Sequence, residues 1–327
     1  MKRPLVALAV TTTALSLAAC SSTASQNTTD DASSQTTYRI GISQIVSHTA
    51  LDSAREGFKS AFDEAGLAVE WVEENAQGDQ GTATAIAATF AASDLDLVLA
   101  IATPTAQAAA NTIADIPVLF TAVTDPVSAQ LVDSLEAPGG NVTGTTDMNP
   151  VAEQIGLIKK FAPDATTVGI LYSSGEINSK VQVNLAKAAA EAEGLTVKEA
   201  TVTNSGEVQQ AAQSLSDVDA FYVPTDNTVV SAIAAVVQVA ETEGIPIIAG
   251  EGNTVTSGAL ATYGVDYAAL GKQTAQMAIR ILTEGADPAT MPVEEQDVFE
   301  LIINKTAAEA IGITIPDDLA QEATIIE

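Results

Sequence analysis

The sequence has 327 residues, with 42 Asp or Glu against 13 Lys or Arg, so the formal net charge at pH 7 is −29. A chain this acidic repels nucleic-acid phosphates and anionic lipids, which argues against nucleic-acid binding and electrostatic adhesion to a bilayer. Chains of this length tend to split into two domains.

The first 19 residues have the pattern of a secretory signal peptide. Lys2 and Arg3 supply positive charge, a short apolar run follows, and small residues precede Cys20. The run is shorter than the roughly 20 apolar residues that a membrane-spanning helix needs. Leu-Ala-Ala-Cys resembles the bacterial lipobox, so we predict a signal peptide at 1–19 and a lipid anchor on Cys20. The alternative is a plain signal peptide followed by an incidental cysteine.

The next segment predicts a flexible tether. Residues 21–37 read SSTASQNTTDDASSQTT, with no large apolar side chain to bury. Serine-rich stretches of this kind behave as flexible linkers. We therefore assign 20–37 to the lipidated cysteine and linker, and expect the folded part to begin at Tyr38.

From Tyr38 onward, apolar β-rich runs alternate with alanine-rich stretches of helical composition. The run LDLVLAIA at 95–102 is continuously apolar, as expected for a strand buried on both faces of a parallel sheet. Strict alternation predicts an α/β fold in which helices cover both faces of parallel sheets. The helical stretches predicted to end at a glycine stop at Gly66, Gly194, Gly244 and Gly285. The predicted strands are 39–46, 68–73, 95–101, 117–121, 167–171, 197–201, 220–223, 246–249, 259–263 and 298–303.

Two distant segments share one order of elements. Residues 96–120 run from an apolar strand through a polar turn and a helix to Ile-Pro and another strand, and residues 219–248 do the same. We therefore predict two similar lobes.

Polar turns follow most of the predicted strands. Ligands of open α/β sheets bind outside the carboxyl ends of the strands, so these turns predict the rim of a cleft between the lobes. Thr103 and Asp226 are alternatively helix N-caps. A zwitterionic amino acid suits the turns, because hydroxyls and helix N–H groups offer donors to a carboxylate and Asp226 offers an acceptor to an ammonium group.

Signatures of catalysis and metal binding are missing from the sequence. His48 is the only histidine and Cys20 the only cysteine, which argues against zinc. There is no P-loop, no Gly-x-Ser-x-Gly motif and no Cys–His pair. We predict no catalytic residue, no metal and no cofactor, and keep a secreted hydrolase as an alternative. His48 either contacts a ligand or orders the first strand–helix turn.

Long motifs in order carry a resemblance to a known family. They are ISQIVSHTALDSAR (42–55), AIATPTAQ (100–107), VLFTAVTDP (118–126), PGGNVTG (138–144), VPTDNT (223–228), YGVDY (263–267) and INKTAAEAIGITIP (303–316). The chain resembles ABC-transporter substrate-binding lipoproteins of the tryptophan-binding-protein-like family, which have the type I periplasmic-binding-protein fold. The resemblance implies two doubly wound parallel-sheet lobes joined by a three-segment hinge. We expect the N-terminal lobe at 38–148 plus 252–292 and the C-terminal lobe at 149–251 plus 293–327.

The resemblance also implies a function and a site. It implies a monomeric, lipid-anchored protein on the extracytoplasmic face that captures an amino acid, aromatic or apolar, for the permease subunits of an ABC importer. A nucleoside-binding lipoprotein and a sensor module remain alternatives. The residues expected to contact ligand are Gln44, His48, Thr103, Thr105, Asp125, Asn178, Ser179, Asp226, Asn227, Glu251 and Tyr263.

Overall fold

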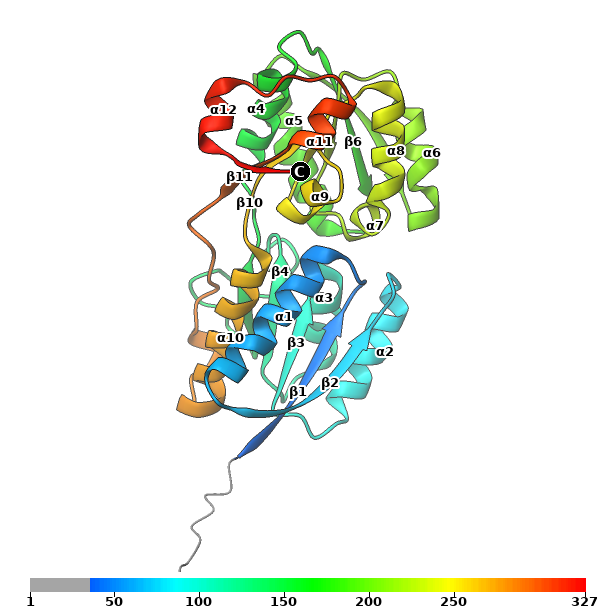
Figure 1. The fold of residues 1–327 in the computed structure, drawn as a ribbon. Coiled ribbons are helices and arrows are strands. Elements are labelled where there is room, and N and C mark those ends of the chain that lie inside the picture. Colours follow the sequence, from blue (N-terminus) through cyan, green and yellow to red (C-terminus); the bar gives the residue numbers. More distant parts are fainter. Residues whose placement is uncertain (1–35) are drawn as a thin grey trace, which may run out of the picture. The chain divides into compact units, whose positions relative to one another are not determined.

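In the computed structural model, which describes residues 36–327, the strands form two sheets, each the centre of one lobe (Figure 1). The signal peptide, Cys20 and most of the linker lie outside the described residues. This two-lobed α/β architecture confirms the predicted fold class.

The first lobe holds a five-stranded parallel sheet in the order β2-β1-β3-β4-β5. Its core includes the continuously apolar strand that the sequence predicted, in which every residue is buried. The strands are β1 (Thr37–Gln44), β2 (Ala68–Asn75), β3 (Leu97–Ile101), β4 (Val118–Val123) and β5 (Val142–Thr146). The helices are α1 (Thr49–Glu64), α2 (Gln80–Ala91), α3 (Thr103–Thr112), α10 (Tyr267–Glu284) and the short η2 (Pro288–Thr290).

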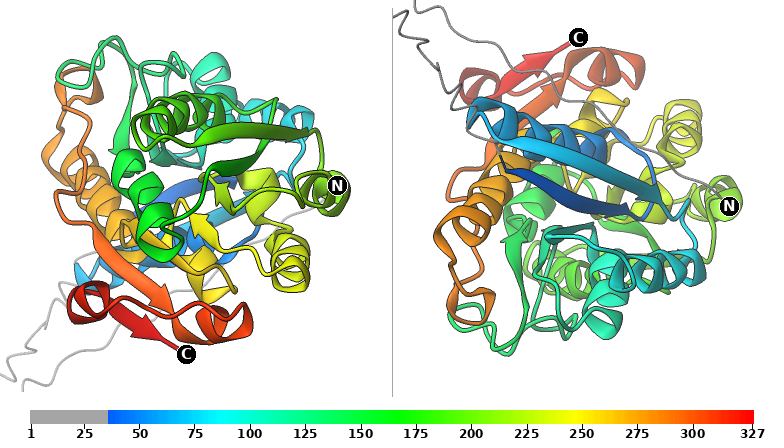
Figure 2. Two further views of the ribbon diagram at one scale, coloured as in Figure 1. Left: turned by 90° about the horizontal axis from the view of Figure 1, so that it is seen from above. Right: turned by 90° about the horizontal axis from the view of Figure 1, so that it is seen from below.

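The second lobe holds a seven-stranded sheet in the order β12-β11-β10-β9-β8-β6-β7. Helices lie on both sides of each sheet (Figure 2). The strands are β6 (Thr167–Ser173), β7 (Thr196–Val202), β8 (Ala220–Val223), β9 (Ile247–Ala249), β10 (Ala261–Gly264), β11 (Glu300–Asn304) and β12 (Thr324–Ile326). The helices are α4 (Val151–Phe161), α5 (Ile177–Ala192), η1 (Ser205–Glu207), α6 (Val208–Ser214), α7 (Asn227–Val230), α8 (Ile233–Glu243), α9 (Gly252–Thr256), α11 (Lys305–Ala310) and α12 (Asp317–Glu322).

The ten predicted strands are present. The sequence analysis missed two further strands, β5 and β12, and the antiparallel direction of β11. β5 reads VTGTT and looks like a loop, yet Thr143 and Thr145 are buried with their hydroxyls hydrogen-bonded. β12 is a three-residue edge strand. β11 pairs antiparallel with β10, so the second sheet is mixed rather than purely parallel.

The lobe boundaries differ from those expected. β10 belongs to the second sheet and α9 packs against β9, β10 and β11, so residues 252–264 lie in the C-terminal lobe rather than the N-terminal one. Glu294 still bridges to Thr145 of the first lobe, so the last return to the second lobe comes after it. The boundary was wrong because the residue pattern of a strand does not show which of the two sheets that strand joins.

Three chain segments cross between the lobes, and side chains tie them together. The segments are 147–150, 265–266 and 291–299. The Val265 backbone N–H donates to Asn149 Oδ1 at 3.3 Å, which joins the first two crossings. Gln296 exchanges two hydrogen bonds with the backbone of Asp266, at 3.1 and 3.2 Å, which joins the second and third.

Helix ends follow the sequence signals, with one correction. The four predicted glycines all adopt left-handed backbone, with φ from 69° to 71°. Asp226 caps α7, as the sequence analysis allowed, and Asp266 caps α10. Thr103, however, is the first residue of α3, and its N-cap is Ala102, at a φ of 79°.

Helices α1 and α10 are far apart in sequence but lie side by side (Figure 1). They pack closely because each helix places a glycine against the backbone of the other. A Cβ on Gly57 would lie 2.1 Å from the Ala268 carbonyl oxygen, and a Cβ on Gly271 would lie 1.9 Å from that of Ala54. This contact fastens the returning segment to the first lobe.

We predict that Gly271→Ala lowers the free energy of unfolding by about 1–3 kcal/mol, because the added methyl group forces the two helices apart. Urea denaturation measures the change. The matched control is Gly156→Ala in α4, where a Cβ would meet nothing within 4 Å and which is expected to be neutral or slightly stabilising. Equal stabilities for the two variants would contradict the close contact.

Candidate functional site

The loops at the carboxyl ends of strands from both lobes enclose a small space, which we call the inner chamber. The first lobe contributes the loop after β1, the start of α1, the end of β4 and the loop after β5. The second lobe contributes the loop after β8, helix α7 and the loop after β9. Tyr267, at the start of α10, completes the wall. The lining residues are His48, Leu51, Ala122, Asp147, Thr225, Asn227, Val230, Glu251 and Tyr267.

Two buried carboxylates stand in the inner chamber. Asp147 and Glu251 are each 2 % exposed, and no Lys or Arg lines the chamber. Burial raises the pKa of Asp147, and burial together with Asp147 raises the pKa of Glu251 to about 7. The raised pKa values show that burying two carboxylate charges is unfavourable, and no cation among the lining residues offsets it. The chamber is therefore suited to a positively charged group.

Neutral hydrogen-bond donors hold both carboxylates in place. The Tyr267 hydroxyl donates to Asp147 Oδ2 at 2.5 Å, and Thr124 Oγ1 donates to Asp147 Oδ1 at 3.3 Å. Glu251 caps α9, accepting from the Asn253 backbone N–H at 2.6 Å and from the Thr254 hydroxyl. Each carboxylate is therefore oriented without being neutralised.

His48 faces the same chamber, and its ring lies next to the side chain of Asn227. Both of its ring nitrogens are buried, and neither makes a hydrogen bond of normal geometry. Burial lowers the pKa of the imidazole to about 4, with Asn227 and Asp52 opposing the shift. The His48 side chain makes no cap hydrogen bond to α1. With a pKa of about 4, the imidazole is neutral at pH 7.

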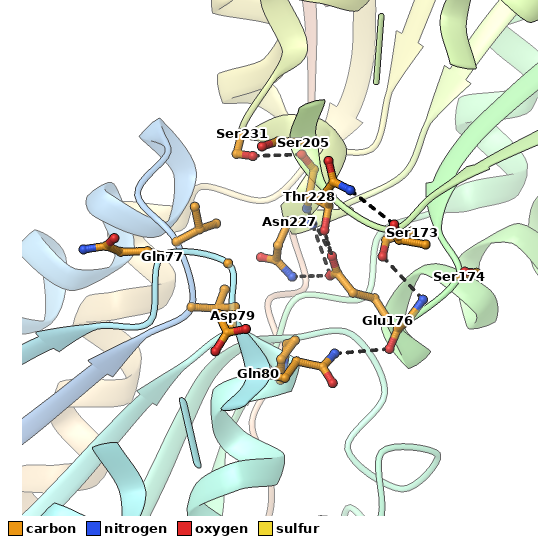
Figure 3. Close-up of a pocket in the computed structure, with 17 residues that line it drawn as sticks. Gln77, Asp79, Gln80, Ser173, Ser174, Glu176, Ser205, Asn227, Thr228 and Ser231 are labelled. Carbon is orange, nitrogen blue, oxygen red and sulfur yellow. Dashed lines mark hydrogen bonds between the residues drawn. The ribbon is translucent and has the colours of Figure 1, made fainter. Parts of the chain in front are cut away.

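A larger cavity of about 450 Å³ adjoins the inner chamber, and Asn227 lines both (Figure 3). In Figure 3, Gln77, Asp79 and Gln80 of the first lobe lie across from Ser173, Glu176 and Asn227 of the second. Its remaining lining residues are Ile45, Val46, Gly78, Pro104, Ser174, Gly175, Thr203, Asn204, Ser205, Thr228 and Ser231. We call this space the outer cavity.

Direct hydrogen bonds join the lobes around the two spaces. Thr124 and Thr225 bring their hydroxyls to 3.4 Å, and Gln182 Nε2 donates to Thr124 Oγ1 at 3.2 Å. At the outer cavity, Gln80 Nε2 donates to the Gly175 carbonyl oxygen at 3.4 Å. These contacts define a closed arrangement of the lobes.

Asp226, predicted to hold an ammonium group, has another role. It is 0 % exposed and lines neither space. Its carboxylate accepts from the Ser173 backbone N–H at 2.5 Å, the Ser179 hydroxyl at 2.6 Å and the Val229 backbone N–H at 2.7 Å. Burial and the nearby Glu176 raise its pKa to about 7. Asp226 thus joins β6, α5 and α7 behind the wall of the site.

Glu176, which the sequence analysis did not select, orders the same wall. It accepts from the Asn227 backbone N–H at 3.2 Å and side-chain amide at 2.5 Å, and from the Thr228 hydroxyl at 2.8 Å. The predicted Asn178 donates to Glu176 at 3.1 Å and to the Thr225 carbonyl oxygen at 3.1 Å. Asn178 and Ser179 therefore position Asn227 and Thr225 rather than line either space.

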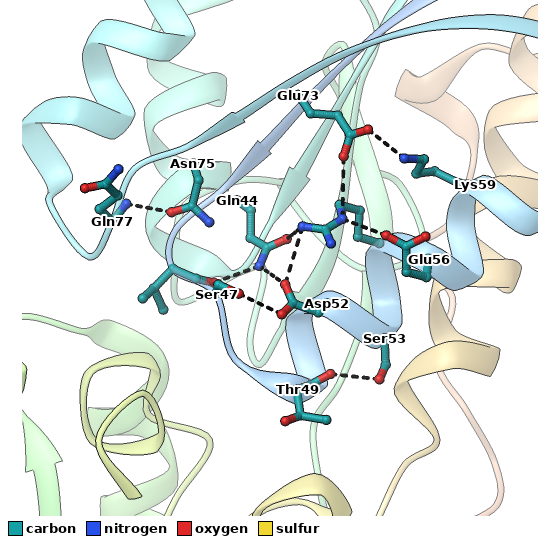
Figure 4. A network of polar contacts seen from close by, with 12 residues as sticks. Gln44, Ser47, Thr49, Asp52, Ser53, Glu56, Lys59, Glu73, Asn75 and Gln77 are labelled. Carbon is teal, nitrogen blue, oxygen red and sulfur yellow. Dashed lines mark hydrogen bonds and ion pairs between the residues drawn. The ribbon is translucent and has the colours of Figure 1, made fainter.

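Gln44 supports the loop that carries His48 (Figure 4). Its Nε2 donates to the Val46 carbonyl oxygen and to Asp52 Oδ1, both at 2.8 Å, and its Oε1 accepts from Arg55 at 3.1 Å. The side chain is 1 % exposed and committed to this network.

The remaining predicted residues lie apart from the inner chamber. The Thr105 hydroxyl, in the first turn of α3, donates to the Ile101 carbonyl oxygen at the end of β3, and Asp125 caps a turn at Val127 and Ser128. Tyr263 points to Glu322, at 3.5 Å. Thr103 is 1 % exposed with an unpartnered hydroxyl, beside Pro104 of the outer cavity.

Of the predicted residues, His48, Asn227 and Glu251 line the inner chamber. Asp147, Tyr267, Thr225, Thr124 and Gln182 were missed. Asp147 follows β5, whose polar sequence hid the strand, and Tyr267 lay in a recognised turn without any feature to single it out.

Two searches of residues 36–327 bear on other site types. Nowhere in this range do three or more His, Cys, Asp or Glu side chains group as metal ligands. None of the helices in the same range is long and apolar enough to cross a membrane.

We predict that Asp226→Asn lowers the free energy of unfolding by about 1–3 kcal/mol, because the amide leaves buried donors without an acceptor. Thermal and urea unfolding measure the change. Asp125→Asn is the control, since that carboxylate caps a half-exposed turn and the variant is expected to lose less than about 1 kcal/mol. If the Asp226 variant is as stable as wild type, the carboxylate does not hold the wall together.

Comparison with known proteins places the chain in a family. The model of the family described as ABC transporter substrate binding protein matches residues 39–326. A tyrosine-binding protein of Clostridioides difficile is 43% identical over 279 residues, which span 84% of this chain and 81% of that protein.

Comparison with solved structures supports the same family. A Streptococcus pneumoniae domain in complex with L-Trp is 39% identical, with a TM-score of 0.86 over 89% of this chain and all of that one (100%). The ligand-free, open structure of a Clostridium difficile substrate-binding protein with adhesive properties is 42% identical, with a TM-score of 0.67 over 89% of this chain and 99% of that one. The chain therefore belongs to the ABC transporter substrate-binding protein family.

Proposed function

We propose that this protein captures an L-amino acid with an aromatic side chain between its lobes, with the α-ammonium group held by Asp147 and Glu251. The observation that carries the proposal is the pair of buried carboxylates in a chamber lined by no Lys or Arg. An ammonium group placed there offers three donors and one positive charge, which offset the burial of both acids.

The start of α3 suits the α-carboxylate group. α3 is ten residues long, and the first turn of a helix presents free backbone N–H groups that attract anions. Thr103 adds a buried hydroxyl without a partner, and Pro104 brings this turn to the wall of the outer cavity. Positive and negative ends of a zwitterion thus find separate partners.

The relatives support an aromatic ligand and lobe closure. One is named a tyrosine-binding protein and another is a complex with L-Trp. The TM-score to the L-Trp complex is 0.86 but only 0.67 to the open, ligand-free structure, although the open one is slightly more identical in sequence. This difference supports a closed lobe arrangement of the kind that a bound ligand stabilises.

The same proposal includes anchoring and delivery. The Leu-Ala-Ala-Cys motif and the polar segment after it support a lipid anchor on Cys20, with the folded lobes held on the extracytoplasmic face. Membership of the family supports delivery of the ligand to the permease subunits of an ABC importer.

Binding is predicted to depend on both carboxylates. Asp147→Asn and Glu251→Gln should each weaken binding of L-tryptophan or L-tyrosine by about 30- to 3,000-fold, since losing one partner of a buried charge pair costs about 2–5 kcal/mol. Isothermal titration calorimetry measures the affinity. Tyr263→Phe is the control and should bind normally, because its hydroxyl points to Glu322. If neither amino acid binds the wild type, the ligand class is wrong; if both carboxylate variants bind normally, the ammonium site is wrong.

Membrane attachment is predicted to depend on Cys20. Cys20→Ala should release the protein into the medium or leave the signal peptide uncleaved, because no thiol remains to be acylated. Fractionation of cells that express either form, followed by mass spectrometry of the N-terminal peptide, measures the outcome. Cys20→Ala protein that stays processed and as membrane-bound as wild type would contradict a lipid anchor.

A further inference from the structure

The two ring nitrogens of His48 are buried polar atoms for which the described residues supply no hydrogen bond of normal geometry. Buried polar groups in native proteins nearly always have partners, so an orphaned pair at a ligand-binding wall calls for a partner from outside the chain. Within the inner chamber, His48 is the only residue with orphaned polar atoms among the described residues.

The imidazole is neutral, and this determines which hydrogen bonds it can make with a ligand. Burial holds its pKa at about 4, so at pH 7 one ring nitrogen donates and the other accepts. The second ring nitrogen of a buried imidazole is often fixed by a carboxylate, but Asp52 is already bonded to Gln44, Ser47 and Arg55. The chain therefore keeps the His48 loop in position, while neither ring nitrogen makes a hydrogen bond of normal geometry, even to the adjacent Asn227.

The charged ends of an amino acid are poor candidates for this partner. An ammonium group binds carboxylates far more strongly than a neutral imidazole, and Asp147 and Glu251 stand in the same chamber. A carboxylate would enter the field of Asp147, Glu251 and Asp52, which repel it. A neutral hydrogen-bonding group on the ligand side chain remains.

We propose that His48 is a specificity-determining residue that hydrogen-bonds a polar group on the aromatic ring of the ligand, a phenol hydroxyl or an indole N–H. The inference rests on the proposed function and deepens it, because it separates L-tyrosine and L-tryptophan from L-phenylalanine. A site built to bond a ring hydroxyl or N–H rejects the analogue that lacks it, since the protein group is then left buried and unpaired.

Calorimetry with L-tyrosine, L-tryptophan and L-phenylalanine tests the assignment. Wild-type protein should bind at least one of the first two about 10- to 100-fold more tightly than L-phenylalanine. His48→Leu should bring the three affinities within about threefold of each other by weakening only the polar ligands, while L-phenylalanine binds as well as before. His48→Gln, which keeps a donor and an acceptor, should restore part of the preference. Glu251→Gln is the contrasting variant and should weaken all three alike.

The outcomes separate this inference from the proposed function. If none of the three amino acids binds the wild type, the proposed function fails and this inference with it. If all three bind the wild type equally, the function stands and the role of His48 is overturned. If His48→Leu is folded by circular dichroism and weakens all three by the same factor, His48 contacts the common amino-acid group, which also overturns the assignment.

Discussion

The burial of negative charge between the lobes is the constraint on which the closed arrangement depends. Asp147 and Glu251 are removed from water by lobes that carry no compensating cation in the inner chamber. Buried carboxylates are costly unless protonated or paired, and the raised pKa of both groups expresses that cost. Because Glu251 binds its proton more tightly when buried, the stability that this proton contributes without ligand is lost as the pH rises through about 7. A cationic group on a ligand removes the same penalty at neutral pH, which makes closure depend on the solute.

The fold provides the rigidity that such a site needs. Asp226 and Glu176 fasten the loops after β6 and β8 from behind, and Gln44 fastens the loop after β1. Asn149 and Gln296 tie together the three short segments that cross between the lobes. The residues that touch a ligand can therefore stay fixed within each lobe while the lobes approach one another.

Much of the fold, but less of the site, could be predicted from sequence. Continuously apolar runs such as that of β3 identify strands because burial on both faces demands them. Strand β5 was not predicted, because its buried threonines look polar in sequence while their hydroxyls are hydrogen-bonded inside the protein. Asp147, the residue directly after β5, was therefore not selected as a site residue. Polar residues in the turns were recognised as a group, yet the pattern does not say which way each side chain points. Asp226 turns inward to cap and brace, whereas Glu251, in an equivalent turn, caps α9 and also faces the chamber.

Small-angle X-ray scattering with and without ligand measures the central claim most directly. At pH 8, above the pKa of about 7 of Glu251, the account predicts separated lobes without ligand and a smaller radius of gyration once L-tryptophan or L-tyrosine saturates the protein. Glu251→Gln, which removes one buried charge, should shift the unliganded protein toward the compact form. A wild-type radius of gyration that stays the same at saturation would contradict closure driven by neutralising the buried carboxylates.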